Sequence, residues 1–452
     1  MEQIIKPNEA ILSILGKEKQ PTASCRLLHY CVTTPVEDGL LLHNTLTREL
    51  LLLTPEEAGN ILQLPYLRSH WCVVPEEIND KQLVGLVRWL RGTLNKEPKH
   101  ITGYTILTTT DCNARCFYCY ELGRARTPMS EETALKTAAY IREHCGGNKV
   151  RIGWFGGEPL YNDRVIDLIC GDLRNNGVAF QSSMISNGYL FDDEMVEKAA
   201  GLWNLKKVQI TLDGTEAVYN RCKAFIYKDG SAYQVVTGNI ARLLSKGIAV
   251  SVRMNMDFHN AADLMELSEE LAQRFGSKGL TVYPHLIFDD QIAWDQHHTI
   301  EKWTELYEAM HRLENRLIEL GIYRGKDLRP RRDLPDHYCM ADDGSTRVIT
   351  PNGSLGVCEH YSETELIGHI DSPEQDQAVI ASFRQRCDEL PECATCFYYP
   401  QCNALKKCPD RIPCIPPEHQ SLLRHQLRAM VNEYQLWKQD PDAAAAEPEE
   451  QD

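Results

Sequence analysis

The sequence lacks the features that would insert it into a membrane or export it. No apolar run in its 452 residues approaches the length that spans a bilayer. Its start, MEQIIKPNEAILSILGKEKQ, has neither a basic n-region with an apolar core nor a small-residue cleavage site. We therefore expect a cytoplasmic protein with no membrane partner.

The sequence also lacks an excess of basic charge, because 48 Lys and Arg residues stand against 64 Asp and Glu residues. The formal net charge is −16 and no basic stripe offsets it, so a nucleic-acid partner is not expected. Part of the acidic charge lies in DPDAAAAEPEEQD (440–452), which we expect to be a disordered tail. Hydrophobic residues make up 43% of the chain, which is enough for two or three globular domains with their own cores.

Cysteine, by contrast, is abundant. A cytoplasmic chain does not keep a disulfide framework, so clusters among its 17 cysteines more often bind metal or do redox chemistry. Cys112, Cys116 and Cys119 crowd into TTTDCNARCFYCYELG (108–123) with the spacing Cys-x3-Cys-x2-Cys. Structural zinc prefers four protein ligands, so three thiolates fit it poorly. On a four-iron cluster, however, three thiolates leave one iron open to an outside ligand.

Residues 1–97 predict a small separate module. Short strands are expected at 26–32, 40–43 and 50–53, before a helix that opens with a capping box at Thr54-Pro55-Glu56-Glu57. A second helix is expected over 77–94, and one of its faces carries Leu83, Leu86, Val87 and Leu90. Three strands followed by helices are typical of a winged-helix-like module, and the alternative is a structural extension of the next domain.

From residue 98 to 325, strands alternate with amphipathic segments. The strands are expected at 103–109, 150–155, 178–185, 206–212, 248–256 and 280–287. Six β-α units imply a parallel sheet, either a partial (β/α)6 TIM-like barrel or an open doubly wound sheet. The strands at 206–212 and 248–256 alternate apolar with polar residues, and a single polar face suits a cavity for a polar ligand. The partial barrel is therefore the predicted fold.

Two motifs follow the first two of these strands, where parallel α/β folds place their chemistry. The cysteine stretch comes after the first strand, and Gly156-Gly157-Glu158-Pro159 ends the second. We expect the glycines to let a ligand approach the backbone, and Glu158 to offer a carboxylate to an ammonium group.

The two motifs resemble the signatures of the radical S-adenosylmethionine (SAM) superfamily, over residues 104 to about 290. The resemblance includes the aromatic Tyr118 just before the third cysteine. It implies a [4Fe-4S] cluster on Cys112, Cys116 and Cys119 whose open iron SAM chelates. Reductive cleavage of SAM would then give a 5′-deoxyadenosyl radical that removes a hydrogen atom from the substrate. A reductant such as flavodoxin or ferredoxin would supply the electron.

The resemblance also implies which residues contact SAM. The candidates are the four residues of the second motif and five residues near strand ends: Gly156, Gly157, Glu158, Pro159, Ser186, Asn187, Asp213, Arg253 and Asn255. Gly156, Gly157 and Glu158 would meet the methionyl amine, and Arg253 would meet the methionyl carboxylate. Ser186 and Asn187 would form the end of the third strand that faces SAM. The alternative for Arg253 is an ordinary strand residue exposed at the barrel mouth.

A third region, 330–425, contains eight more cysteines and resembles a SPASM domain, the extension of radical SAM enzymes that carries auxiliary four-iron clusters. The resemblance implies one cluster on Cys339, Cys358 and Cys408. It implies a second on Cys393, Cys396, Cys402 and Cys414, with Cys387 either spare or the missing fourth ligand. Lys406 stands where the family pattern expects a cysteine. The alternative is a zinc ribbon built on Cys393, Cys396, Cys408 and Cys414.

Relatives of this architecture act mainly on peptides. Some install thioether or carbon–carbon cross-links in ribosomally made precursor peptides, and others oxidise a serine or cysteine of sulfatases to formylglycine. Sulfatase-maturing relatives begin with the radical motif almost at once, whereas 111 residues precede Cys112 here. Peptide maturases often carry a leader-binding module at that place, which binds by strand addition. We therefore expect a ribosomal-peptide maturase with a leader-containing precursor peptide as its partner. The alternatives are a sulfatase-maturing enzyme and a non-catalytic iron–sulfur electron carrier.

Glu359, which directly follows Cys358, is the candidate catalytic base. In sulfatase-maturing relatives, an aspartate at the matching position resembles the general base that takes a proton once the substrate radical has formed. The alternative is a solvated glutamate in a turn, and His360, Tyr283 and His285 are rival bases.

Overall fold

The structure is a computed structural model. It describes residues 1–16, 24–94, 98–119, 121, 123–227, 229–287, 300–323, 339–372, 375–386, 393, 396–397, 399–402 and 405–407. Cys387, Cys408 and Cys414, predicted as cluster ligands, lie outside these residues, as does the predicted acidic tail. No helix in the described ranges combines the length and the apolar character needed to cross a bilayer.

Six parallel strands form the main sheet: β7 (Gly103–Thr109), β8 (Val150–Gly156), β9 (Phe180–Ser186), β10 (Leu205–Thr211), β11 (Ala249–Met256) and β12 (Leu280–Leu286). They lie side by side in chain order. An open doubly wound sheet reverses its strand order at a switch point, and this sheet does not. The predicted partial barrel is confirmed, and each strand begins and ends within two residues of its expected position.

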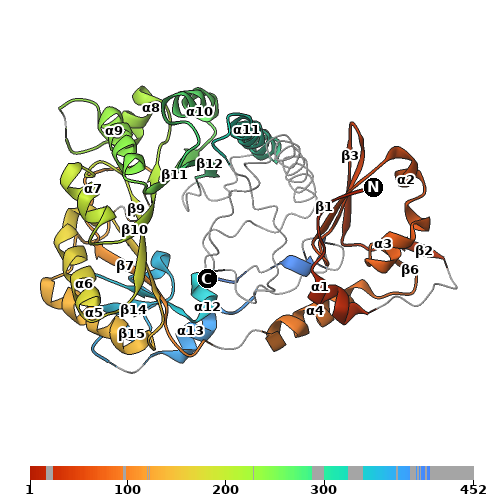
Figure 1. Ribbon diagram of the computed structural model, residues 1–452, viewed down its shortest axis with the longest axis horizontal. Coiled ribbons are helices and arrows are strands. Elements are labelled where there is room, and N and C mark those ends of the chain that lie inside the picture. The colour runs from red at the N-terminus through yellow and green to blue at the C-terminus, as the bar shows by residue number, and fades with distance from the viewer. Residues whose placement is uncertain are drawn as a thin grey trace.

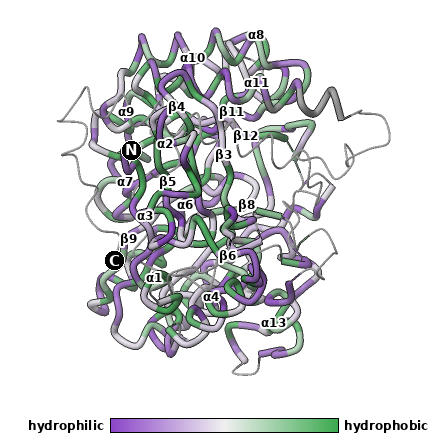
Figure 2. The backbone as a smooth tube through the Cα atoms, turned by 90° about the vertical axis from the view of Figure 1, so that its right-hand side faces the viewer, coloured by the Kyte–Doolittle hydropathy of each residue, from purple (hydrophilic) through white to green (hydrophobic). Residues whose placement is uncertain are grey.

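Helices cover the outer face of the sheet, which curves into an arc (Figure 1). They are α5 (Glu131–His144), α6 (Asp163–Asn175), α7 (Asp193–Ala200), α8 (Glu216–Lys223), α9 (Ala232–Ser245), α10 (Ala261–Phe275) and α11 (Ile300–Glu319). Hydrophobic and hydrophilic residues alternate along α8, α10 and α11 (Figure 2). The apolar side of this layer packs on strand residues such as Trp154, Val208 and Val252, which are completely buried.

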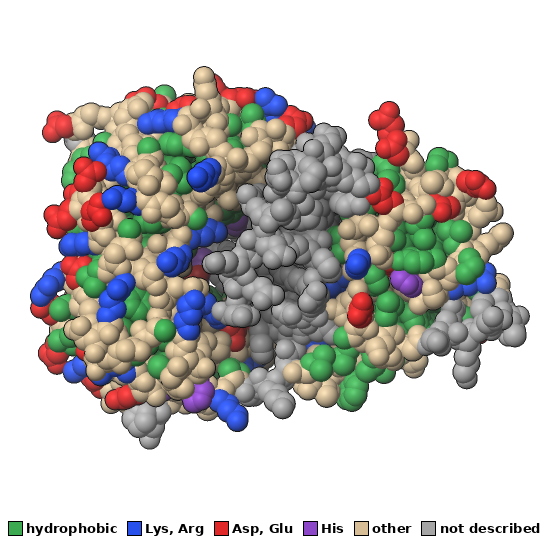
Figure 3. Space-filling model, in the orientation of Figure 1, with side chains coloured by type: hydrophobic (Ala, Val, Ile, Leu, Met, Phe, Trp, Pro, Cys, Tyr) green, Lys and Arg blue, Asp and Glu red, His purple; other side chains and the backbone are tan. Residues whose placement is uncertain are grey.

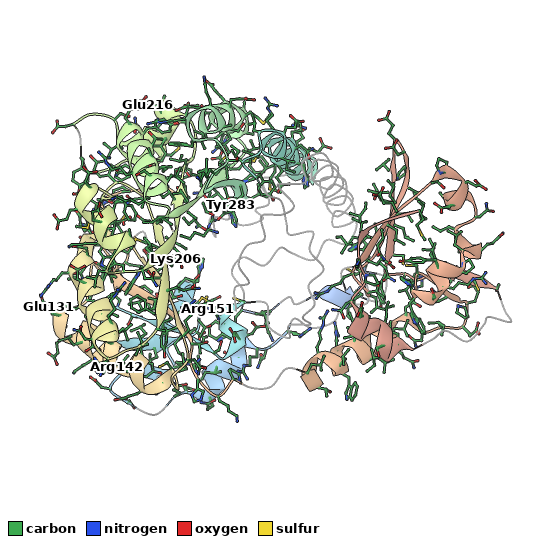
Figure 4. All side chains as sticks on the ribbon, in the orientation of Figure 1. Glu131, Arg142, Arg151, Lys206, Glu216 and Tyr283 are labelled. Carbon is green, nitrogen blue, oxygen red and sulfur yellow. The ribbon has the colours of Figure 1, made fainter. Side chains whose placement is uncertain are left out.

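The inner face of the sheet is polar, as the alternation in the sequence predicts. Tyr283 of β12 lies on this side, whereas Glu131, Arg142 and Glu216 lie on the helical side (Figure 4). The face is not uniformly open to solvent, because Asn255 of β11 is only 3% exposed and is hydrogen-bonded within it. On the outer surface, acidic and basic side chains are interspersed in the view of Figure 3.

Three short strands extend the barrel sheet beyond β7, and the sequence did not predict them. β13 (Thr346–Ile349) pairs parallel with β7, and β14 (Ser354–Gly356) and β15 (Gly368–His369) follow antiparallel. Short helical segments surround them: α12 (Met340–Asp343), η3 (Glu359–Tyr361) and α13 (Gln377–Phe383). Cys358 and Glu359 follow β14, and β14 belongs to the same sheet as β7, which precedes the cysteine loop.

The N-terminal module has its own sheet, in the order β1-β5-β4-β3 with every pairing antiparallel. Its elements are β1 (Glu2–Ile5), α1 (Glu9–Leu15), β2 (Cys25–Leu27), β3 (Cys31–Val36), β4 (Gly39–Asn44), β5 (Glu49–Leu53), α2 (Pro55–Gly59), η1 (Ile61–Gln63), α3 (Pro65–Ser69), β6 (Val73–Pro75) and α4 (Asp80–Leu94). Separate hydrophobic clusters fill this module and the barrel. The module therefore has a core that does not depend on barrel residues.

Several details of the module differ from the expectations. The strand expected over 26–32 is two strands, because β2 pairs with β6 in a second sheet while β3 pairs with β4. The capping box of Thr54 and Glu57 is present, as predicted. The expected buried face of α4 was wrong at Leu86, which is 43% exposed, because the buried stripe runs instead through Leu83, Val84 and Val87.

Among the described residues, the contacts of the C-terminal region with the N-terminal module include two buried aromatic residues. Phe397, which is 4% exposed, packs with Val32, Leu41 and other residues of the module sheet. Tyr399, also 4% exposed, lies in the short helix η5 (Tyr399–Gln401) and packs with module residues that include Tyr30. The contact joins two parts of the chain that are more than 300 residues apart in sequence.

Candidate functional site

Cys112, Cys116 and Cys119 lie half-buried in the loop after β7, and none of the described cysteines forms a disulfide. The Cys112 sulfur lies 3.3 Å from the backbone nitrogen of Ala114 and 3.8 Å from Nδ2 of Asn187, both of which are donors. Burial, followed by the nearby Glu158, raises the pKa of the Cys112 thiol to about 12. Since a thiol must lose its proton to become a ligand, metal binding at this site would release that proton.

The chemistry of the loop fits a cluster better than a single ion. Within the described ranges, no three His, Cys, Asp or Glu side chains converge closely enough to hold one metal ion. A four-iron cluster occupies more room than an ion, and its thiolate ligands accept hydrogen bonds of the kind that Cys112 receives. The three cysteines therefore stay the predicted cluster ligands.

Gly156 and Gly157 lie where a side chain would not fit, and the sequence did not indicate why. A Cβ atom on Gly156 would lie 2.1 Å from the carbonyl oxygen of Thr109, and one on Gly157 would lie 2.3 Å from that of Asp111. The backbone of this segment also donates to the loop, from Gly157 to Thr109 at 3.0 Å and from Glu158 to Asp111 at 2.9 Å. The glycines admit the cysteine loop itself, and the expected approach of a ligand to their backbone stays a prediction.

Glu158 is fully buried and joins the ends of β8 and β9. Its Oε1 accepts from the Ser186 hydroxyl at 2.9 Å and from the Leu160 amide at 3.2 Å, and its Oε2 accepts from the Asn187 amide at 2.8 Å. Burial raises its pKa to about 7, although these donors oppose part of the rise. Asn187 in turn donates to Oδ1 of Asn113 at 2.6 Å. The structure thus brings Glu158, Ser186 and Asn187 together against the cysteine loop.

Pro159 supports the same arrangement. It is buried and begins the short helix η2 (Pro159–Asn162), and its carbonyl oxygen accepts from the Thr108 hydroxyl at 2.9 Å. Its predicted contact with SAM stays a prediction, as do those of its neighbours in the motif.

Asp213 and Asn255, two of the predicted SAM contacts, belong to one buried network. Oδ1 of Asp213 accepts from Asn255 at 2.9 Å, and Oδ2 accepts from the Tyr118 hydroxyl at 2.7 Å. The Lys223 ammonium lies 3.1 Å from the same Oδ2 and donates to the Tyr118 hydroxyl at 2.6 Å. Lys223 was missed in the sequence, because a lysine in the last turn of a helix is ordinary helix-end chemistry.

Arg253 is half-buried on the inner face of β11, which differs from the alternative of an exposed residue at the mouth. Its Nη2 lies 2.8 Å from Nδ1 of His285, one of the rival bases. Its Nε is buried and has no hydrogen-bond partner among the described residues. A buried guanidinium N–H without a partner suits a carboxylate ligand. Tyr283, another rival base, donates to Gln209 at 2.7 Å.

The loop that carries Glu359 lies close to the cysteine loop. Arg124 donates to the Ser362 hydroxyl at 3.2 Å and lies 3.5 Å from the carboxylate of Glu121, which follows Cys119. Burial raises the pKa of Glu121 to about 7, a feature that the sequence did not indicate. Glu359 has a buried Oε2 without a hydrogen-bond partner in the part of the chain that the structure describes. Its role as a base stays a prediction.

The auxiliary-cluster cysteines are placed only in part. Cys358 is half-buried at the start of η3, and burial followed by Glu359 raises its pKa to about 12, while Cys339 is exposed. Successive turns connect Cys393, Cys396 and Cys402: the Cys396 amide donates to the Cys393 carbonyl at 3.3 Å, and the Cys402 amide donates to the Tyr399 carbonyl at 3.3 Å. Since the other assigned ligands lie outside the described residues, the assignment stays a prediction.

Comparison with known proteins finds a matching family model and relatives of low identity. The model of the Radical SAM superfamily matches residues 106–271. An uncharacterized protein of Methanocaldococcus jannaschii is 26% identical over 268 residues, which cover 58% of this chain and 86% of the relative. A probable GTP 3′,8-cyclase of Archaeoglobus fulgidus is 26% identical over 303 residues, which cover 63% of this chain and 95% of the relative.

Solved structures share the fold. The structure of anSMEcpe with bound AdoMet has a TM-score of 0.56 and 13% identity, and the match covers 74% of this chain and 99% of that one. A structure of anSMEcpe with bound AdoMet and a Cp18Cys peptide has a TM-score of 0.55 and 13% identity, with the same coverage. At this level of identity, the likeness concerns the fold.

Proposed function

We propose that this chain, whose partial barrel contains a radical SAM domain at residues 106–271, is an enzyme that cleaves SAM reductively and uses the resulting radical to modify a peptide. The observation that carries the proposal is the junction between the cysteine loop and the segment Gly156-Gly157-Glu158. Two backbone hydrogen bonds and two glycines without room for a side chain hold the segment against the loop. When bound on Cys112, Cys116 and Cys119, a [4Fe-4S] cluster would supply the electron that cleaves SAM.

The protein's own residues would bind and orient SAM. Glu158 fixes the positions of Ser186 and Asn187, and its Oε2, which accepts one hydrogen bond, retains acceptor capacity for an ammonium group. Arg253 offers an unpartnered Nε for a carboxylate. Glu158 lies just past the carboxyl end of β8, where a barrel assembles its site, and Arg253 lies on the inner face of β11.

Two observations support a peptide substrate. The protein anSMEcpe, which shares this fold, has been seen with a peptide and AdoMet bound together. In the N-terminal module, β3 stands at the edge of its sheet and pairs, among the described strands, only with β4. An edge strand can accept an added peptide strand, so we infer that the leader of a ribosomally made precursor peptide pairs with β3. The barrel site would then install a thioether or carbon–carbon cross-link.

Two alternative functions differ from this proposal in the substrate that they require. A sulfatase-maturing enzyme would use the same barrel site but would not need a leader-binding module. An iron–sulfur electron carrier would need neither SAM nor a peptide.

The test is to reconstitute the full chain anaerobically and supply SAM and dithionite. The substrate is either the precursor peptide encoded beside its gene or a sulfatase-derived peptide with a reactive cysteine. Mass spectrometry should show that the precursor peptide has lost the mass of two hydrogen atoms, because forming one cross-link removes one hydrogen atom from each of the two joined side chains. Formylglycine on the sulfatase peptide with an unchanged precursor would favour the first alternative. A chain that binds iron but no SAM would favour the second.

A further inference from the structure

A lysine that the proposed function does not use is buried beside the cysteine loop. Lys223, the last residue of α8, is 2% exposed. Its ammonium donates to the hydroxyl groups of Tyr118, at 2.6 Å, and of Thr211, and it lies 3.1 Å from Asp213. Lysine is almost never fully buried unless it is paired, and its burial therefore has a specific cause at this place in the fold.

The backbone fixes this lysine relative to the loop. The Arg115 amide donates to the carbonyl of Lys223 at 2.9 Å, and the Ile226 amide donates to the carbonyl of Asn113 at 2.9 Å. Ala224 between them has φ +45°, so the chain leaves the helix in a left-handed turn and runs along the loop. Lys223 is thus held by both its backbone and its side chain against the segment between Cys112 and Cys119.

Lys223 carries a positive charge at neutral pH. Burial alone would lower its pKa, but Asp213 and then Cys116 more than offset this and raise the pKa above the usual value. The ammonium lies 2.6 Å from the hydroxyl oxygen of Tyr118, the residue that directly precedes Cys119, so its charge lies beside the cysteine loop.

We propose that the charge of the Lys223 ammonium raises the reduction potential of the cluster held by Cys112, Cys116 and Cys119. This inference rests on the proposed function. Reduction adds an electron to an anionic cluster. A buried ammonium in a medium of low dielectric constant stabilises the reduced state more than the oxidised state. Asp213 opposes this effect, so the two residues form a buried pair with opposite influence on the same potential.

The opposite signs make the proposal testable. Redox titration of the reconstituted full chain would be followed by electron paramagnetic resonance, using the cluster signal that changes when SAM is added. Lys223→Met should lower the midpoint potential, Asp213→Asn should raise it, and Lys223→Arg should leave it near the wild-type value. The control is Lys206→Met, which removes an exposed lysine of β10 and should produce no shift.

A merely structural role gives a different result. Lys223→Met and Asp213→Asn break the same ion pair, so structural damage would move both potentials in the same direction, and that outcome overturns the proposal. An unchanged potential in Lys223→Met also overturns it. If Lys223→Met does not fold, a fall in the Asp213→Asn potential or a large shift in Lys223→Arg overturns it equally. Failure of the proposed function looks different, because the wild-type chain would then show no signal that responds to SAM.

Discussion

Truncation of Tyr399 should loosen the N-terminal module from the C-terminal region without unfolding the module. The Tyr399 ring is 4% exposed, and the guanidinium of Arg88 on α4 lies 4.3 Å from the ring centroid. Arg88 also donates to the Tyr399 hydroxyl at 3.2 Å and to its carbonyl at 3.4 Å. Tyr399→Ala removes the ring and both side-chain contacts but keeps the backbone carbonyl.

The expected effects can be ranked by size. Truncating a buried aromatic ring to alanine costs about 3–5 kcal/mol, and a contact between a cation and an aromatic ring accounts for about 0.5–2 kcal/mol of such a loss. Tyr399→Phe keeps the ring and loses the hydrogen bond from Arg88, and a hydrogen bond is worth about 1 kcal/mol. The equilibrium between docked and undocked module should therefore shift by roughly a hundredfold or more in Tyr399→Ala, and by about fivefold in Tyr399→Phe.

Hydrogen exchange followed by mass spectrometry measures this directly. Amides of α4 that face the contact should exchange faster in Tyr399→Ala, only slightly faster in Tyr399→Phe, and the amides of β4 and β5 should keep their protection. Trp89→Ala is the matched control, because Trp89 lies on the same helix but is 61% exposed, so its truncation should cost less than about 0.5 kcal/mol. Equal exchange of α4 in the wild type and Tyr399→Ala would refute the reasoning, because the contact would then contribute nothing to docking.

Three further predictions concern the site and the module. Deletion of residues 1–97 should spare SAM cleavage in the absence of peptide and abolish modification of a leader-containing peptide. Modification at the wild-type rate would make the module structural only. Glu359→Gln should still release 5′-deoxyadenosine while modified peptide falls by roughly two to four orders of magnitude, the usual cost of losing a general base, whereas a normal yield would assign the base elsewhere. Burial raises the folded-state pKa of Glu158 to about 7, against 4.5 when unperturbed, so its contribution to the stability of the metal-free chain is fully present below pH 4.5 and is lost as the pH rises through 7. The melting temperature of the wild type should therefore fall relative to that of Glu158→Gln between pH 5 and pH 8, and parallel pH profiles would contradict the assigned pKa.

The barrel could be predicted because its pattern is local. Alternation within 206–212 and 248–256 reveals a strand and its polar face before any tertiary contact is known, and both strands lie where expected. The two motifs could be placed on loops for the same reason, since each directly follows a strand. The structure then brings the ends of those strands together, as parallel pairing requires.

Other features depend on contacts that no local pattern carries. β13 has four residues and owes its place in the barrel sheet to pairing with β7, more than 200 residues away. Lys223 looks like an ordinary helix-end cation until the fold places Asp213 and Tyr118 around it. The glycines at 156 and 157 were recognised, but the neighbour that excludes a side chain, the backbone of Thr109 and Asp111, belongs to another loop. Leu86 shows the limit within a helix, because two hydrophobic stripes were available on α4 and packing chose the one through Val84.

The central claim is that Cys112, Cys116 and Cys119 hold the cluster that cleaves SAM. The most direct measurement is the amount of 5′-deoxyadenosine released from SAM by the anaerobically reconstituted chain with dithionite, compared with a variant in which all three cysteines are alanine. Iron content should be measured in both preparations. We predict release by the wild type and none by the triple variant, which should still retain the iron of its auxiliary clusters. Undiminished release by the triple variant would contradict the claim.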